Sequence, residues 1–127
     1  MHTSNLTQAI VAEYLRRGLM KEHVASICHS YALQMNRMLD HLATFPDTAF
    51  TRPEGGLFLW AELPKTIDAL KLAPAAIDRC VAYVPGTHFY CEDGTHLNTI
   101  RLNFSNSTLD QIDEGMTILR DLILKNR

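Results

Sequence analysis

Apolar residues recur at steps of three and four along the first third of the chain, a spacing that predicts helices with one apolar face. The first helix is expected over Asn5–Arg17, where Asn5 and Gln8 stand at capping-box spacing and Gly18 offers a stop. A longer helix is expected from Lys21 to about Thr44. Its apolar stripe comprises Val24, Ile27, Cys28, Tyr31, Met35, Met38, Leu39 and Leu42.

The middle of the chain changes to short apolar segments separated by turn residues, a pattern typical of strands. A brief strand is expected over Ala49–Arg52, followed by a turn that contains Gly55 and Gly56. The next segment, Leu57–Ala61, is apolar at every position and predicts a strand that is covered on both faces.

A helix is expected to begin near Thr66 and Asp68, and Pro74 leaves its continuation to Ile77 open. A strand is expected over Val81–Val84. Residues 87–98 are polar and aromatic without a period, which predicts a loop.

The segment Thr99–Phe104 alternates most strictly and predicts a strand with one buried face. Its apolar positions, 100, 102 and 104, are expected in the core, so that the other face presents Arg101. Ser107 and Asp110 then stand at the spacing of a capping box before a final helix. That helix has its apolar residues at Leu109, Ile112, Met116, Leu119 and Ile123.

This order of elements predicts an α+β fold over residues 1–127: a two-layer sandwich in which helices cover a small, mostly antiparallel sheet. A chain of 127 residues with 46% apolar residues can form a core without disulfides or metal. The formal charge of −2 gives no electrostatic footprint for nucleic acid or an anionic membrane. We therefore expect a small organic ligand, with no nucleic acid and no membrane as partner.

The cysteines and the hydropathy bear on the compartment. Cys28, Cys80 and Cys91 form neither a CxxC pair nor an even framework, which favours a reducing cytoplasm. No apolar run approaches the roughly 20 residues that span a bilayer. The sequence therefore predicts a cytoplasmic protein without an anchor.

Arg101 is the best candidate for chemistry, because a guanidinium fixed on a strand can bind a carboxylate through two parallel hydrogen bonds. The ordinary alternative is an arginine that is solvated or paired with a nearby acid. No two histidines stand four residues apart on a helix, so no metal site is expected. His88, Cys91 and His96 are interpreted as surface residues of the loop.

Four segments together resemble the C-terminal part of class I/II, fold-type I aminotransferases, especially the aminoadipate and kynurenine aminotransferase group. They are HTSNLTQAIVAEYL near the start, RPEGGLFLWAELP at 52–64, VAYVPGTHFY at 81–90 and TIRLNFS at 99–105. The resemblance implies the small domain of the pyridoxal 5'-phosphate (PLP)-dependent transferase fold, with residues 1–20 as an interdomain helix region. Cys80, where glycine is usual, and His88, where a small residue is common, depart from the pattern.

The resemblance also implies substrates and roles. Arg101 would bind the α-carboxylate of an α-amino acid or a 2-oxo acid, Phe58 would line the pocket, and Trp60 would pack. The lysine that bonds to PLP belongs to a segment that is not in this sequence. We therefore expect that the large PLP-binding domain is absent, that this chain alone binds no cofactor and is inactive, and that the full-length protein is a PLP-dependent homodimer.

Two alternatives to an aminotransferase share these features. The first is a transcription regulator that joins a DNA-binding winged helix to an aminotransferase-like module containing this domain. The second is a free-standing, non-enzymatic regulatory domain of α+β type that binds an amino acid.

Overall fold

The computed structural model describes residues 3–92 and 94–127, and the chain divides into a unit of residues 1–30 and a unit of residues 31–127. The first unit contains α1 (Asn5–Arg16). Ser4 caps this helix by accepting a hydrogen bond from the Thr7 N–H, so the predicted cap at Asn5 is wrong by one residue. Gly18 ends the helical turn with a φ of +71°, a conformation that favours glycine.

The helix α2 (Met20–Leu42) contributes its first part to the first unit and Tyr31–Leu42 to the second. It ends two residues before the predicted Thr44, because the Thr44 and Phe45 N–H groups bond back three residues in a tighter turn. The part of the predicted stripe in the first unit is not buried, and Val24 is 45% exposed. Only the last turns of α2 enter the core.

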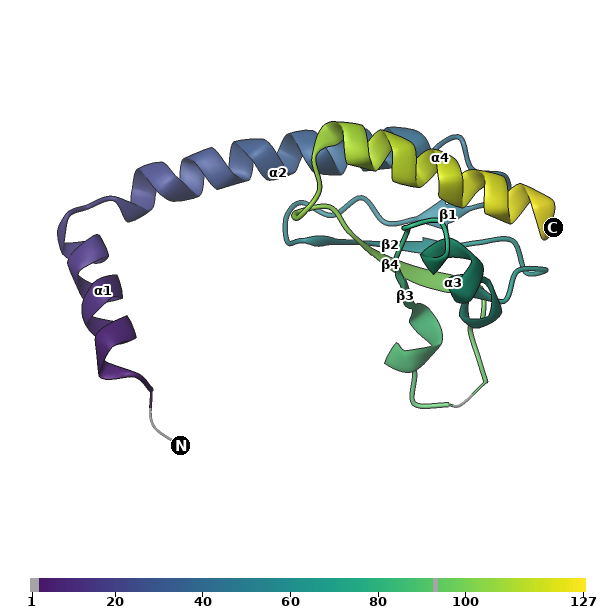
Figure 1. Ribbon diagram of the computed structural model, residues 1–127, viewed down its shortest axis with the longest axis horizontal. Helices are drawn as coiled ribbons and strands as arrows, with labels where there is room; N and C mark the ends of the chain where they lie inside the picture. The colour runs from purple at the N-terminus through teal and green to yellow at the C-terminus, as the bar shows by residue number, and fades with distance from the viewer. Residues whose placement is uncertain (1–2, 93) are drawn as a thin grey trace. The chain divides into compact units, whose positions relative to one another are not determined.

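The second unit is built on a four-stranded antiparallel sheet, which confirms the predicted α+β class. The sheet order is β1-β2-β4-β3 (Figure 1). The strands are β1 (Ala49–Phe50), β2 (Phe58–Glu62), β3 (Val84–Pro85) and β4 (Thr99–Asn103).

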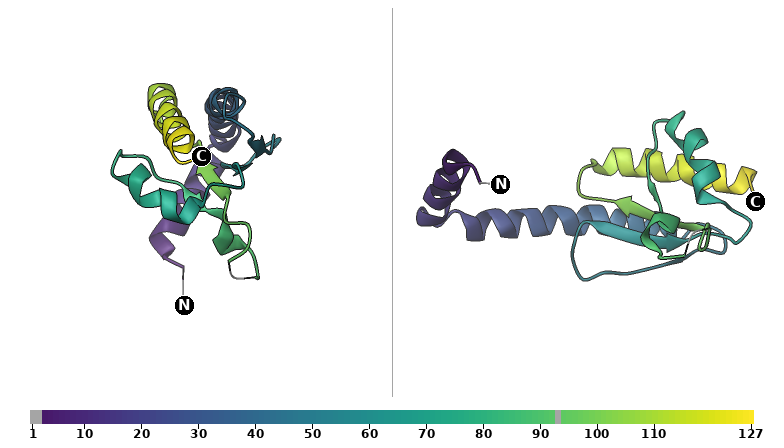
Figure 2. Two further views of the ribbon diagram at one scale, coloured as in Figure 1. Left: turned by 90° about the vertical axis from the view of Figure 1, so that its right-hand side faces the viewer. Right: turned by 90° about the horizontal axis from the view of Figure 1, so that it is seen from below.

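The register of β2 against β4 divides their side chains between two faces of the sheet. Leu59 is the Cα partner of Leu102, and Ala61 is the partner of Ile100. These four residues are buried against the end of α2, α3 (Ala69–Ile77) and α4 (Leu109–Lys125). In Figure 2, left, the end of α2 that belongs to this unit and α4 lie on one side of the sheet. The fully buried large side chains are Leu42, Leu59, Leu63, Ile100, Phe104, Leu119 and Ile123.

The other face of the sheet differs from two sequence-based expectations. Phe58 is 42% exposed, so the start of β2 is covered on one face only within the residues described, whereas Trp60 on the same face is partly buried. Thr99, expected on the polar face, is buried, and its hydroxyl donates to the His96 carbonyl at 2.7 Å. The apolar face of β2 without helical cover is therefore the face that presents Arg101.

The segment between α3 and β3 also differs from prediction. The helix α3 continues through Pro74 to Ile77, with Leu72 and Ala76 buried on its inner side. The strand predicted over Val81–Val84 is reduced to Val84–Pro85, because the Val81 N–H bonds back to the Ala76 carbonyl at the end of α3.

Two further elements complete the unit. The predicted loop at 87–98 contains the 3-10 turn η1 (Gly86–Phe89), and Asp93 lies outside the described residues. The capping box of α4 is formed by Thr108 and Gln111, one residue after the predicted pair. None of the helices in the described part of the chain is both long and apolar enough to cross a lipid bilayer.

Candidate functional site

Arg101 lies at the centre of β4, on the sheet face opposite the helices. Its neighbours Ile100 and Leu102 point into the core, and strand alternation turns Arg101 the other way. Trp60 of β2 and Val84 of β3 are its Cα partners on either side. The guanidinium is therefore held by an inner strand of the sheet.

Aromatic rings surround this guanidinium. Arg101 Cζ lies 4.2 Å from the ring centroid of Phe58 and 4.7 Å from that of Phe89, within the range of cation–π attraction. Trp60 makes edge contacts with Phe89 and with Tyr90, at centroid distances of 5.7 and 6.1 Å. The structure thus places the rings of Phe58 and Phe89 beside Arg101.

The sequence reasoning missed Phe89 and Tyr90 because their segment has no periodicity. The available signal was the aromatic pair Phe89 and Tyr90 at the end of the segment VAYVPGTHFY, which resembles aminotransferases. Tyr90 in turn stacks on His96, with ring centroids 3.8 Å apart. Both histidines of the segment, His88 and His96, are exposed, as is Cys91.

Within residues 3–92 and 94–127, Arg101 forms no ion pair, and no side chain or carbonyl accepts a hydrogen bond from its guanidinium. Its Nε is buried without an acceptor. Buried N–H groups normally have partners, because an unpaired one costs free energy. The arrangement leaves a cation next to apolar rings, with its Nη donors, and not the buried Nε, available to an anionic ligand.

Two other constellations do not form sites in the described part of the chain. No group of three or more His, Cys, Asp or Glu residues there is arranged to hold a metal ion. Gly56 has a φ of +89° and belongs to the turn before β2, which fits its interpretation as a turn residue.

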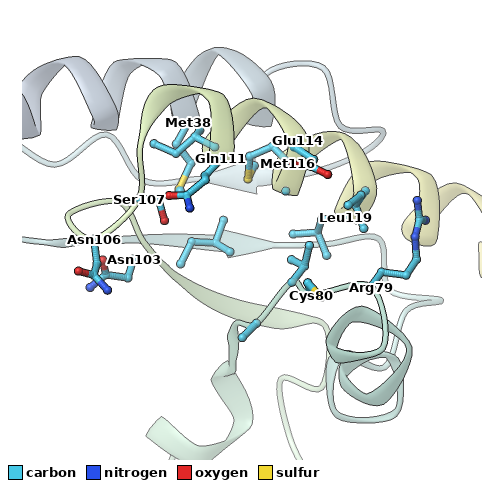
Figure 3. Close-up of a pocket in the computed structure, with 16 residues that line it drawn as sticks. Met38, Arg79, Cys80, Asn103, Asn106, Ser107, Gln111, Glu114, Met116 and Leu119 are labelled. Carbon is cyan, nitrogen blue, oxygen red and sulfur yellow. The ribbon is translucent and has the colours of Figure 1, made fainter.

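A separate open hollow of about 400 Å³ lies on the helix-covered side of β4. Figure 3 shows α4 side chains, including Gln111, Met116 and Leu119, across from Cys80. Leu102 lines this hollow, whereas its neighbour Arg101 points from the opposite face of the strand. The hollow and the guanidinium are therefore distinct features of the fold.

Comparison with known proteins decides the family. Residues 1–119 match the family of class I and II aminotransferases. This chain belongs to that family. It is 40% identical over 125 residues to an uncharacterized aminotransferase of Saccharolobus solfataricus, covering 97% of this chain and 31% of that protein. It is 37% identical over 123 residues to aromatic-amino-acid aminotransferase 1 of Thermococcus litoralis, covering 95% and 29%.

Solved aminotransferases share the fold. The α-aminoadipate aminotransferase LysN of Thermus thermophilus, complexed with N-(5'-phosphopyridoxyl)-L-leucine, superposes with a TM-score of 0.88 at 33% identity. The match covers 98% of this chain and 32% of LysN. The chain thus spans about a third of the length of the aminotransferases that it matches. The resemblance to aminotransferases drawn from the four sequence segments is confirmed.

The lysines of this chain lie on its surface. The chain has four lysines, Lys21, Lys65, Lys71 and Lys125, and all are exposed. Lys71 pairs with Asp68 at the start of α3, at 3.2 Å. None is among the residues that contact Arg101, so this site offers no lysine to bond to PLP.

Cys80, the first departure from the family pattern, has a φ of +61°. This left-handed conformation explains why glycine is usual there, since glycine adopts it without steric cost. Cys80 closes the C-terminus of α3 and lines the hollow, away from the Arg101 face. Cysteine in place of glycine at this position is therefore expected to affect the C-terminal end of α3 and not the binding of substrate.

Proposed function

We propose that this chain is the small domain of a PLP-dependent aminotransferase and that Arg101 binds the α-carboxylate of its substrates. The observation that supports this proposal most strongly is the environment of the guanidinium. It lies on the sheet face opposite the α-helices, against two aromatic rings, with no acid paired with it among the described residues.

An arginine suits this task because its planar fork of donors matches the two oxygens of a carboxylate. Water does not reach the Arg101 Nε, so a carboxylate oxygen of similar size would not reach it either. The carboxylate would therefore bind Nη1 and Nη2. A transaminase takes up amino acids with different side chains, and a clamp on their common carboxylate orients each of them in the same way.

Phe58 is proposed as a wall of the same substrate site. Its ring contacts Arg101 and is 42% exposed, so it presents apolar surface beside the guanidinium. An apolar surface next to the clamp would lower the local dielectric and strengthen the ion pair with the carboxylate. Trp60, which is less exposed, is proposed to support Phe89 and Tyr90 and not to contact substrate.

The remaining parts of the proposal concern the larger protein. PLP, which takes up and releases the amino group when bound, would be held by residues outside this chain, because none of its lysines lies at the Arg101 face. We propose that the whole protein is a homodimer that moves an amino group between an α-amino acid and a 2-oxo acid. Its free cysteines Cys28, Cys80 and Cys91 fit a cytoplasmic location.

The proposal is tested in the enzyme that contains this chain, with Arg101→Lys compared with Arg52→Lys. Lysine keeps the charge but loses the planar fork, so kcat/KM for amino acids should fall by about 100-fold, whereas Arg52→Lys should stay within about twofold of wild type. Arg52 is the control, because its Cζ also lies over an aromatic ring, that of Phe50, at 5.3 Å, but it is exposed and is not among the residues that contact Arg101. Equal kinetics of the two variants would refute the role of Arg101.

A further inference from the structure

The ring of Phe89 occupies a place that core packing does not explain. Phe89 is 50% exposed, although a large apolar side chain is normally more stable when buried. Its aromatic and cationic contacts are with Trp60, whose ring meets it edge to face, and with the guanidinium of Arg101. The Phe89 side chain therefore lies on the surface of the sheet, partly exposed to solvent and beside the guanidinium of Arg101.

The turn that presents Phe89 is tightly fixed to the sheet. Pro85, the residue before η1, is the Cα partner of Ile100 in β4. Gly86 is buried, and a Cβ atom at this position would clash with Thr99 Oγ1 and lie 2.6 Å from Trp60 Cη2. Such close approach of the backbone to the sheet sets the position of the ring three residues later.

We propose that Phe89 is a positioning residue that holds the Arg101 guanidinium ready for a carboxylate. This inference rests on the proposed function of Arg101 and goes beyond it. An arginine side chain has several rotatable bonds, and ordering it on binding costs conformational entropy. Contact with the Phe58 and Phe89 rings restricts the guanidinium before the ligand arrives, so that less entropy is lost when the carboxylate binds.

The contacts of the guanidinium also determine which of its N–H donors remain available to a ligand. The rings of Phe58 and Phe89 attract the cation through their π faces, and Nε is out of reach of solvent. The Nη groups are then the donors that an incoming carboxylate can use. Phe89 would thus fix both the place of the guanidinium and the direction from which its ligand approaches.

The first experiment measures how freely this side chain moves in the 127-residue chain. In the ¹⁵N-labelled protein, the Nε–Hε signal of Arg101 is assigned by its loss in Arg101→Lys. Rotation about the Nε–Cζ bond and exchange of Hε with water should both be slower for Arg101 than for Arg52, which is exposed and lies over one ring. Equally fast rotation and exchange for the two arginines would overturn the inference without any variant of Phe89.

Phe89→Leu keeps an apolar side chain and removes the π face. We expect it to speed the rotation and exchange of Arg101 by about threefold to tenfold, the range that corresponds to one cation–π contact. Phe89→Tyr should restore the slow rates. The matched control is Phe50→Leu, which removes the ring beneath Arg52 and should change the Arg52 signal but not that of Arg101. Unchanged Arg101 rates in Phe89→Leu, or equal changes in Phe50→Leu, would overturn the inference.

Titration with sodium acetate then separates this inference from the proposed function. If both hold, the Arg101 signal shifts with acetate, and Phe89→Leu weakens the binding by about threefold to tenfold. If the wild-type Arg101 signal does not shift with acetate while Phe89→Leu still speeds the motion of the side chain, carboxylate binding by Arg101 is refuted, and only the restriction of the guanidinium by Phe89 is supported. Equal acetate affinity of wild type and Phe89→Leu would overturn the positioning role and leave carboxylate binding intact.

Discussion

Gly86 and Trp60 approach so closely that no side chain fits between them: a Cβ atom at position 86 would lie 2.6 Å from Trp60 Cη2. Gly86→Ala should therefore lower the free energy of unfolding by about 1–3 kcal/mol, the usual cost of overpacking. Gly55→Ala is the control, because nothing lies within 4 Å of the added methyl group and the φ of Gly55 is not positive. Urea unfolding followed by tryptophan fluorescence measures both, and equal stability of the two variants would show that the turn can move away from the sheet.

Asp68 caps α3, and its lowered pKa predicts that the free energy of unfolding decreases in the acid range. Its Oδ1 accepts hydrogen bonds from the Leu70 and Lys71 N–H groups, at 3.0 and 3.2 Å. The Lys71 N–H is the largest cause that lowers the pKa of Asp68 below its usual 3.8, although burial opposes it. A carboxylate whose pKa is lower in the folded state stabilises the fold above its unfolded pKa, and this stabilisation is lost as the pH falls through the folded pKa.

Asp68→Asn keeps a capping oxygen without the charge, so its difference in stability from wild type should shrink as the pH falls from about 5 to about 2. Asp68→Ala removes the cap and should cost about 1 kcal/mol at neutral pH. Urea unfolding at several pH values measures these differences. A constant difference between wild type and Asp68→Asn across this range would mean that the charge of Asp68 has no part in capping.

The buried hydroxyl of Tyr83 predicts a second pH dependence of stability, in the alkaline range. Its hydroxyl donates to the Ala69 carbonyl at 2.6 Å, and burial, followed by the negative charge of Asp68, raises the pKa of Tyr83 to about 12. The protonated phenol is the form that the fold favours. Its contribution to stability is therefore complete below the ordinary pKa of 10.0 and is lost as the pH rises toward 12.

A spectrophotometric titration of phenolate absorbance checks this prediction. One of the four tyrosines should ionise near pH 12 in the wild type, and this late step should be missing in Tyr83→Phe. The variant should also lose about 1 kcal/mol of stability at neutral pH, the net value of one hydrogen bond. A titration curve that Tyr83→Phe leaves unchanged would contradict the assignment.

The sheet could be predicted where one physical rule dominates. The alternation of Ile100, Leu102 and Phe104 identifies the buried face of β4, and the structure buries all three. The same rule places Arg101 on the opposite face. In β2 the first four positions are all apolar, so the sequence does not distinguish the buried face of Leu59 and Ala61 from the face of Phe58 and Trp60.

The remaining differences come from contacts that sequence spacing does not contain. The cap of α4 lies at Thr108 and not at Ser107, because neighbouring hydroxyl residues both fit the cap position and only the backbone geometry distinguishes them. The apolar character of Val81 predicts a strand, but its N–H donates a hydrogen bond to the Ala76 carbonyl at the end of α3. Phe89 belongs to a segment without hydrophobic periodicity, and its position depends on the close approach of Gly86 to the sheet.

The central claim, that Arg101 recognises a carboxylate, is tested most directly by a ratio of rates in the PLP-loaded enzyme that contains this chain. The measurement compares kcat/KM for an amino acid with kcat/KM for the corresponding amine, which lacks the carboxylate. Arg101→Ala should reduce the value for the amino acid by about 100-fold or more and leave the slow reaction of the amine within about threefold, so the preference collapses. A preference for the amino acid that persists unchanged in Arg101→Ala would contradict the claim.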